Sequence, residues 1–106
     1  MNLEEIVFSI IISAGNARAR AYDALASAQE GDFEKAKVYI REAEKEVGDA
    51  HKVQTEIIQR EAKGDKVELS LLFVHAQDHL MTAISEKGLI ENMIKLYKRI
   101  NILENR

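Results

Sequence analysis

The sequence predicts an all-α protein, an antiparallel up-down-up bundle of three long helices. Three observations support this prediction. Apolar residues recur at 3-4 spacing through three long segments, and no stretch alternates apolar and polar residues for long enough to form a strand. The chain has no proline and only five glycines, and the natural breaks in the pattern are Gly31-Asp32 and Gly64-Asp65. Because glycine tolerates the left-handed conformation after a helix and aspartate accepts bonds from free N–H groups, both pairs predict a helix end and a turn.

The first helix is expected over about residues 2–30. Asn2, with Glu5 three residues later, resembles a capping box. The apolar stripe that follows is bulky at first and consists of alanine later: Leu3, Val7, Ile10, Ala14, Ala17, Ala21, Ala24 and Ala28. We therefore expect partner helices to come closest to its second half.

The second helix is expected over residues 32–63. Its stripe keeps the same spacing and runs through Phe33, Ala36, Ile40, Ala43, Val47, Ala50, Gln54 and Ile57. Gln54 is its one polar member, and His51 lies one turn earlier. Because a buried polar group without a partner costs about 1–3 kcal/mol, we interpret the two side chains as a buried hydrogen-bonded pair.

The third helix is expected over residues 68–103, with its start between Val67 and Ser70. Its predicted seam reads Leu69, Leu72, Ala76, His79, Ala83, Glu86, Ile90, Met93, Tyr97 and Ile100. Short turns join the three segments, so consecutive helices must run antiparallel.

A polar cluster interrupts one face of this third helix. At about 100° per residue, His75, Asp78, His79, Thr82 and Glu86 share an arc about 100° wide. In later turns the same arc is apolar. A stripe that is buried at one end and polar at the other is typical of a site at the mouth of a cleft.

Three apolar residues, Phe73, Val74 and Met81, fall outside the predicted seam. Exposed apolar side chains on adjacent turns indicate that another surface covers them. A chain of 106 residues has a small core of its own, so we expect homo-oligomerisation.

Composition narrows the function classes. The 106 residues are enough for a single domain, 1–106, and 46% hydrophobic with 31% charged residues is the balance of a folded protein. A net charge of −3 lacks the basic footprint of a nucleic-acid binder. The absence of cysteine excludes disulfides, thiolate metal sites and a cysteine nucleophile, and fits a reducing compartment. The apolar residues 6–12 follow two glutamates and fall short of the roughly 20 residues of a membrane span, so we expect a cytoplasmic protein.

Several chemistries fit the cluster. His75 and His79 at i, i+4 have the spacing of zinc ligands, but the His-Glu-x-x-His order is missing. General acid–base hydrolysis lacks an obvious serine nucleophile or paired carboxylate. Phosphoryl transfer to an imidazole nitrogen fits as well, because a neutral histidine is nucleophilic and His79 or Gln77 can stabilise phosphoryl oxygens. Spacing alone favours a structural polar cluster over any of the three.

Residues 74–82, Val-His-Ala-Gln-Asp-His-Leu-Met-Thr, resemble a known signature. They are similar to the active site of the enzyme IIA component, lactose/cellobiose (N,N'-diacetylchitobiose) class, of the phosphoenolpyruvate-dependent sugar phosphotransferase system (PTS). The resemblance covers nearly the whole chain. It includes residues 13–18 on the first helix, Gly31-Asp32-Phe33 at the first corner, residues 50–55 on the second helix and the Leu96-Tyr97-Lys98 ending.

The resemblance implies a phosphotransferase component that works in a relay. His75 would accept a phosphoryl group on Nε2 from the phosphocarrier protein HPr and pass it to a cysteine of the IIB component. IIB would serve a β-linked disaccharide entering through the membrane component IIC. His79 and Gln77 would join His75 as catalytic residues, although on the helical wheel Gln77 points about 160° away from His75 and is expected to serve a neighbouring subunit.

The resemblance also implies a homotrimer with its active site near a subunit boundary. Asp78 would meet its two symmetry mates on the three-fold axis and hold a divalent cation such as Mg²⁺, which removes the repulsion between the carboxylates. The alternative is a non-catalytic helical adaptor or metal-stabilised oligomer with a structural histidine cluster. The sugar cannot be named from the sequence, because this chain handles only the phosphoryl group.

Overall fold

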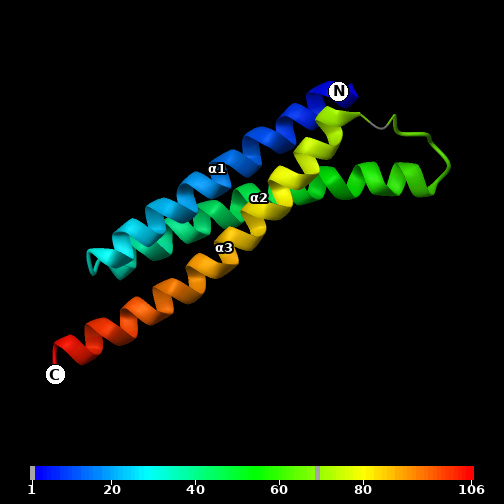
Figure 1. The fold of residues 1–106 in the computed structure, drawn as a ribbon. Coiled ribbons are helices and arrows are strands. Elements are labelled where there is room, and N and C mark those ends of the chain that lie inside the picture. The colour runs from blue at the N-terminus through cyan, green and yellow to red at the C-terminus, as the bar shows by residue number, and fades with distance from the viewer. Residues whose placement is uncertain (1, 69) are drawn as a thin grey trace.

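The computed structural model describes residues 2–68 and 70–106, and its regular elements are three α-helices. They are α1 (Leu3–Gln29), α2 (Phe33–Ala62) and α3 (Leu71–Glu104). The chain runs up α1, returns along α2 and runs up α3, so α1 and α3 are parallel and their N-terminal ends lie together (Figure 1). The molecule is a rod of 61 × 19 × 19 Å. The predicted up-down-up bundle is confirmed.

Each helix begins at a polar side chain that accepts a hydrogen bond from the backbone N–H three residues later. Asn2 caps α1 at 2.9 Å, Asp32 caps α2 at 3.1 Å and Ser70 caps α3 at 3.0 Å. Such caps satisfy N–H groups that have no partner inside the helix. The Ser70 cap places the start of α3 at Leu71, three residues later than the predicted residue 68.

The two predicted turn glycines have the left-handed backbone that their position requires. Gly31 has a φ of 84° and Gly64 a φ of 98°, and no other described residue has a positive φ. A side chain at either position would strain the turn, because L-residues other than glycine rarely adopt this region. The glycines thereby end α1 and α2 where the sequence predicts.

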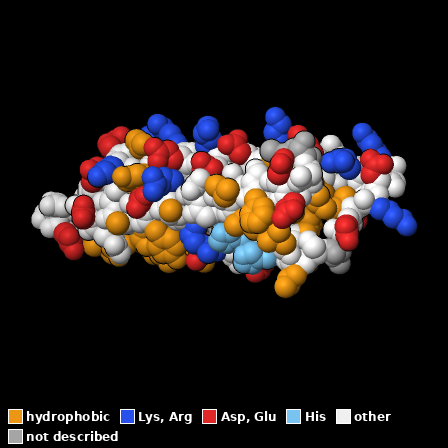
Figure 2. All heavy atoms as spheres, turned by 90° about the horizontal axis from the view of Figure 1, so that it is seen from above, with side chains coloured by type: hydrophobic (Ala, Val, Ile, Leu, Met, Phe, Trp, Pro, Cys, Tyr) orange, Lys and Arg blue, Asp and Glu red, His pale blue; other side chains and the backbone are white. Residues whose placement is uncertain are grey.

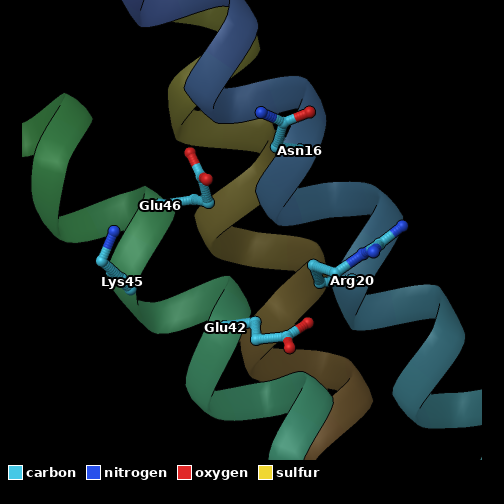
Figure 3. Close-up of a pocket in the computed structure, with 5 residues that line it drawn as sticks. All are labelled: Asn16, Arg20, Glu42, Lys45 and Glu46. Carbon is cyan, nitrogen blue, oxygen red and sulfur yellow. The ribbon is translucent and has the colours of Figure 1, made fainter.

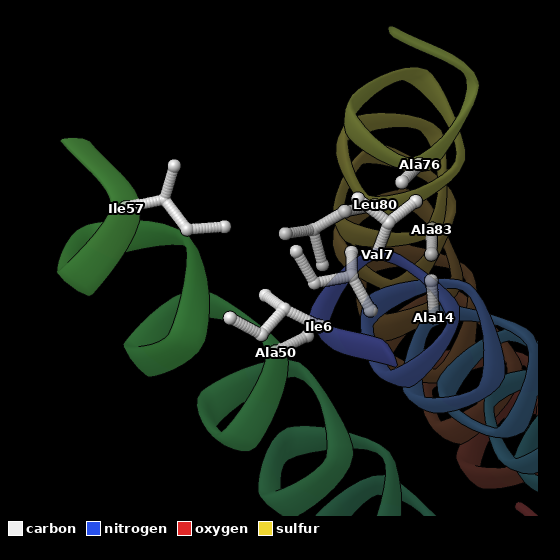
Figure 4. Close-up of a cluster of buried hydrophobic side chains, with 9 residues drawn as sticks. Ile6, Val7, Ala14, Ala50, Ile57, Ala76, Leu80 and Ala83 are labelled. Atoms are coloured by element: carbon white, nitrogen blue, oxygen red, sulfur yellow. The ribbon is translucent and has the colours of Figure 1, made fainter. Parts of the chain in front are cut away.

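The core follows the alanine stripe of α1. Ala14, Ala17, Ala21 and Ala24 are fully buried, and each lies at the predicted 3-4 spacing. Toward the N-terminus of α1 the core is larger, and aliphatic side chains from all three helices meet there (Figure 4). The alanines of the second half form a second core cluster with side chains of α2 and α3: Ala21, Ala24, Ala28, Ala36, Ala43, Ile90 and Ile94.

The buried line of α3 differs from the predicted seam. Leu80 and Ile94 are buried, whereas Met93 and Ile100 are exposed. The core line is therefore turned by about 50° round the helix from the predicted one. Sequence spacing allows either line, and burial of the larger aliphatic side chain Leu80 decides between them. Leu69, which we expected in the seam, lies outside the described residues.

Phe73 was predicted on an outer face, and this is wrong. Its side chain is half-buried and packs against the core cluster near the N-terminus of α1. The physical reason is that α3 has two neighbours, so its buried arc is wider than a single seam. Val74 and Met81 are exposed, as predicted.

Lys87 occupies the one charged position of the α3 core line. Its side chain is only 15% exposed and pairs with Glu44 of α2 at 3.5 Å and with Glu91 one turn later on α3. Two carboxylate partners satisfy the charge of Lys87, so its long side chain can occupy the core line between Ala83 and Ile90. None of the described helices contains an apolar stretch long enough to cross a membrane.

We predict that Leu80→Ala lowers the free energy of unfolding by about 2–5 kcal/mol, because it leaves a cavity in the three-helix contact. Leu71→Ala is the matched control, since Leu71 lies on the same helix with 86% of its surface exposed. Urea denaturation of both variants measures the difference. Equal losses would show that Leu80 does not carry the core.

Candidate functional site

The parallel helices α1 and α3 pack side by side, and side chains from both meet in register along the line between them, which we call the α1–α3 groove. Gly15, Arg18 and Tyr22 of α1 lie on one side. Each lies beside a residue 64 positions later in the sequence, which for Gly15 is His79. The 3-4 spacing on both helices keeps them facing each other over two turns.

His75 and His79 stack one above the other at the upper end of this groove. Their ring centroids are 5.8 Å apart and the ring planes differ by 7°. His75 is exposed and His79 is half-buried. In the space-filling view, the visible histidine side chains gather at one place on the surface, with hydrophobic side chains on both sides along the rod (Figure 2). The predicted pairing of the two imidazoles is confirmed as geometry.

The pKa of His79 lies below its usual value. Partial burial, which disfavours the charged form, is the main cause, and the positive charges of Arg18 and protonated His75 add to it. The carboxylates of Asp78 and Glu86 oppose the shift but do not cancel it. His79 therefore stays neutral at neutral pH and presents an uncharged ring to its neighbour.

Below the histidines, Arg18 is held by two residues of α3. Its Nη2 donates to Thr82 Oγ1 at 2.7 Å, and its Nε forms an ion pair with Glu86. Tyr22 donates its hydroxyl proton to the same Glu86 carboxylate at 3.1 Å, and this bond raises the pKa of Tyr22. The Thr82 hydroxyl donates in turn to the backbone carbonyl of Asp78 at 3.0 Å. Arg18 thus connects two members of the predicted polar arc, Thr82 and Glu86.

Arg18 and Tyr22 were not among the predicted site residues. A signal for them was present, because Gly15, Arg18 and Tyr22 repeat at 3-4 spacing beside the alanine stripe. The sequence does not give the register between α1 and α3, which is the set of residues of α1 that lie beside given residues of α3. That register decides which arginine of α1 meets the polar arc.

Gln77 lies on the other side of α3, away from His75, as the helical wheel predicts. Its Oε1 accepts a hydrogen bond from Nε2 of Gln54 on α2. The predicted pair of Gln54 with His51 is therefore wrong, because His51 is exposed on α2 and the amide of Gln77 takes its place. A half-buried amide needs a partner, and the nearest helix supplies an identical group.

Asp78 lies on a third face of α3. It is exposed, between the equally exposed Val74 and Met81 on adjacent turns. The described residues of this single chain include no group of three or more metal-ligating side chains. Within one chain, Asp78 is therefore a surface carboxylate.

A separate hollow of about 450 Å³ opens between α1 and α2. It is lined by Asn16 and Arg20 of α1 and by Glu42, Lys45 and Glu46 of α2 (Figure 3). Both signs of charge are present, and neither histidine of the stacked pair lines this hollow. It is distinct from the α1–α3 groove.

The three-helix rod recurs in known proteins. Residues 5–98 match the family described as PTS system, Lactose/Cellobiose specific IIA subunit. The chain belongs to this family. It is therefore a phosphotransferase component that carries a phosphoryl group within a relay.

Individual relatives of this IIA family agree with the assignment. The lichenan-specific phosphotransferase enzyme IIA component of Bacillus subtilis is 47% identical over 98 residues, which cover 92% of this chain and 89% of the relative. The crystal structure of the cellobiose-specific enzyme IIA from Bacillus anthracis has a TM-score of 0.92 and 44% identity, and covers 96% of this chain and 94% of that one. The IIA(chitobiose) chain in a complex with HPr has a TM-score of 0.84 and 40% identity, with 95% and 98% coverage.

We predict that Gln54 and Gln77 are energetically coupled. In a double-mutant cycle, the losses of unfolding free energy in Gln54→Ala and Gln77→Ala should add to about 1 kcal/mol more than the loss in the double variant. Chemical denaturation of the four proteins measures the coupling. A cycle of His51→Ala with Gln54→Ala is the control and should show no coupling.

Proposed function

We propose that His75 is the residue of this IIA component that carries the phosphoryl group, on its Nε2 atom. HPr supplies the group and a cysteine of the IIB component receives it, in support of the uptake and phosphorylation of a β-linked disaccharide entering through IIC. The observation that carries this proposal is the exposed imidazole of His75, stacked at 5.8 Å on His79 at the mouth of the groove. The metal-site and hydrolase alternatives have no further support among the described residues.

The stacked geometry suits a nucleophile. Parallel rings cannot hydrogen-bond to each other through their edges, so His79 leaves the nitrogens of His75 open to the donor. The Nε2 lone pair of neutral His75 forms the bond to phosphorus while the bond from phosphorus to the donor breaks. In the second step the IIB thiolate attacks phosphorus and the bond to Nε2 breaks, which returns His75 to its neutral form.

His79 is proposed to orient the phosphoryl group. Its Nε2 faces Gly15, where a methyl group would lie at 3.6 Å, so glycine leaves that edge of the ring uncovered. A neutral imidazole donates one hydrogen bond, and the lowered pKa of His79 keeps it neutral beside a second imidazole. Gln77 contacts Gln54 instead of the groove, so we propose that within one chain it acts by holding α3 against α2.

The HPr complex formed by a structural relative supports HPr as the donor. The names of the relatives carry three different sugars, lichenan, cellobiose and chitobiose, so the family does not fix the sugar. A carrier that handles only the phosphoryl group has no need to hold the sugar. A cytoplasmic location remains our proposal, in line with the sequence. Family membership disfavours the alternative of a non-catalytic helical adaptor.

We further propose that the chain assembles as a homotrimer through the outer face of α3. Asp78 heads a line of exposed leucines, Leu89, Leu96 and Leu103, which are 56%, 58% and 57% exposed. Asp78 and Leu96 are 18 residues apart, or about five helical turns, so they lie on the same side of α3. Such a line is apolar surface of the kind that another subunit covers.

A three-fold axis along this line would bring three Asp78 carboxylates together. One chain alone cannot form the site, because its described residues hold no group of three metal-ligating side chains. Three carboxylates do fit a divalent cation such as Mg²⁺, since oxygen ligands are what it prefers, and the cation offsets their repulsion. In this proposal the cation stabilises the assembly and takes no part in the transfer.

We predict that His75→Ala abolishes labelling from phosphoenolpyruvate through enzyme I and HPr, because it removes the nucleophile. The wild type should take up acid-labile, base-stable phosphate. His51→Ala is the matched control, since His51 is an exposed histidine on another helix. An unlabelled wild type, or equal labelling of His75→Ala, would refute the proposal.

We predict that a chelator weakens the wild-type trimer and leaves the Asp78→Leu variant assembled, because leucine removes the repelling charges. Sedimentation with and without chelator measures the assembly. Asp49→Leu, on the exposed surface of α2, should behave like the wild type. A wild-type assembly that ignores chelator and contains no metal would contradict the axial cation.

A further inference from the structure

The α1–α3 groove contains Arg18, a cation that is already paired with the Glu86 carboxylate. Arg18 is the one cationic residue among the described side chains that hydrogen-bond or ion-pair across this groove. Its partner Glu86 also receives the hydroxyl of Tyr22, and the side chains of Arg18 and Glu86 are each 34% exposed. An ion pair with this exposure contributes little to stability, about 0–1 kcal/mol. Stability therefore does not explain why the ion pair lies beside the stacked histidines.

We infer that Arg18 is the cationic partner of the phosphoryl group on His75, and that Glu86 is an internal anion that holds Arg18 until the group arrives. The inference rests on the proposed function and adds to it a residue of α1 that recognises the phosphorylated state. When His75 is phosphorylated, the guanidinium exchanges one carboxylate for phosphoryl oxygens. No bond other than the proposed nitrogen–phosphorus bond is made or broken.

Arg18 has only a short distance to move in this exchange. Arg18 is level with Thr82, which lies two turns, about 10 Å, below His75 along α3. Because side chains lean toward the N-terminus of their helix and α1 is parallel to α3, an extended Arg18 leans toward the histidines. In this proposal the group on Nε2 extends toward Arg18 from His75, which lies on the same face of α3 as Thr82. His79 lies between them along α3, and its Nε2 lies beside Gly15, one turn before Arg18 on α1.

The chemistry favours the exchange. A phosphoryl group carries about −1.5 to −2 charges at neutral pH, and a guanidinium binds its oxygens through two parallel N–H bonds. Glu86 offers one negative charge and keeps the hydroxyl of Tyr22 after Arg18 leaves. Partial exposure of both side chains lets water replace the broken contact. Glu86 thus competes with the phosphoryl group and lowers its affinity for the site, which keeps the group transferable to the next carrier.

The proposal predicts opposite effects for the two partners of one ion pair. Arg18→Gln should lower the equilibrium ratio of phosphorylated to free protein, measured against phosphorylated HPr, by about tenfold. Glu86→Gln should raise the ratio by about tenfold, because Arg18 is then free for the phosphoryl group. ³¹P NMR at a fixed ratio of the two carriers measures both. A purely structural ion pair predicts losses of the same sign for both variants.

Arg20→Gln is the matched control, with the same change of charge two residues away on α1. Arg20 pairs with Asp23 at 3.0 Å and lines the hollow shared with α2, so its loss should leave the ratio unchanged (Figure 3). Circular dichroism checks the folding of each variant. If Arg18→Gln does not fold, Glu86→Gln alone tests the inference, because a loss of stability cannot raise the ratio of phosphorylated to free protein.

The outcomes separate the two proposals. Phosphorylation of His75 in the wild type, with opposite shifts in the two variants, supports the inference. Phosphorylation of the wild type with shifts of one sign, or none, overturns the inference and leaves the function intact. A similar loss in Arg20→Gln shows an effect of net charge only and also overturns it. A wild type that takes up no phosphoryl group overturns both.

Discussion

The close packing of α2 and α3 against the alanine stripe of α1 is the constraint on which the rest of this structure depends. Ala14, Ala17, Ala21 and Ala24 leave no side-chain bulk between the helix backbones. Short side chains let backbones approach, and the 3-4 repeat keeps the approach continuous along the rod. α1 therefore contacts both other helices along its length. The groove that carries the stacked histidines is the open edge of one of these contacts.

The packing also divides α3 into three faces with different tasks. One face meets α1 and carries His79 and Glu86 at the groove. A second face meets α2, where Gln77 pairs with Gln54. The third face, which Asp78 heads, is exposed in the part of the chain that the structure describes. In our proposals, the angle of a polar residue round α3 decides whether it serves phosphoryl transfer, packing or assembly, so neighbours in sequence have different roles.

The groove satisfies its polar groups without burying a lone charge. Arg18 and Glu86 form an ion pair, and Tyr22 donates a hydrogen bond to the other oxygen of the Glu86 carboxylate. Thr82 accepts a hydrogen bond from the Arg18 guanidinium and donates one to a backbone carbonyl. Partial exposure keeps these contacts exchangeable, since water can replace any partner that moves. The same exposure leaves His75 accessible to another protein while burial keeps the pKa of its neighbour His79 low. An accessible imidazole beside an uncharged ring fits the transfer of a phosphoryl group that we propose for His75.

The sequence by itself determined the three helices, their caps at Asn2 and Asp32, their turns at Gly31 and Gly64, and the facing of His75 and His79. These features depend on residues a few positions apart, whose relation is set by the local geometry of one helix. Only the tertiary structure decided that Leu80 enters the core, that Phe73 is covered, that Gln54 bonds Gln77 instead of His51, and that Arg18 joins the site. Each of these depends on the rotation and register of one helix against another, which the packing of all three helices fixes together and no single helix encodes.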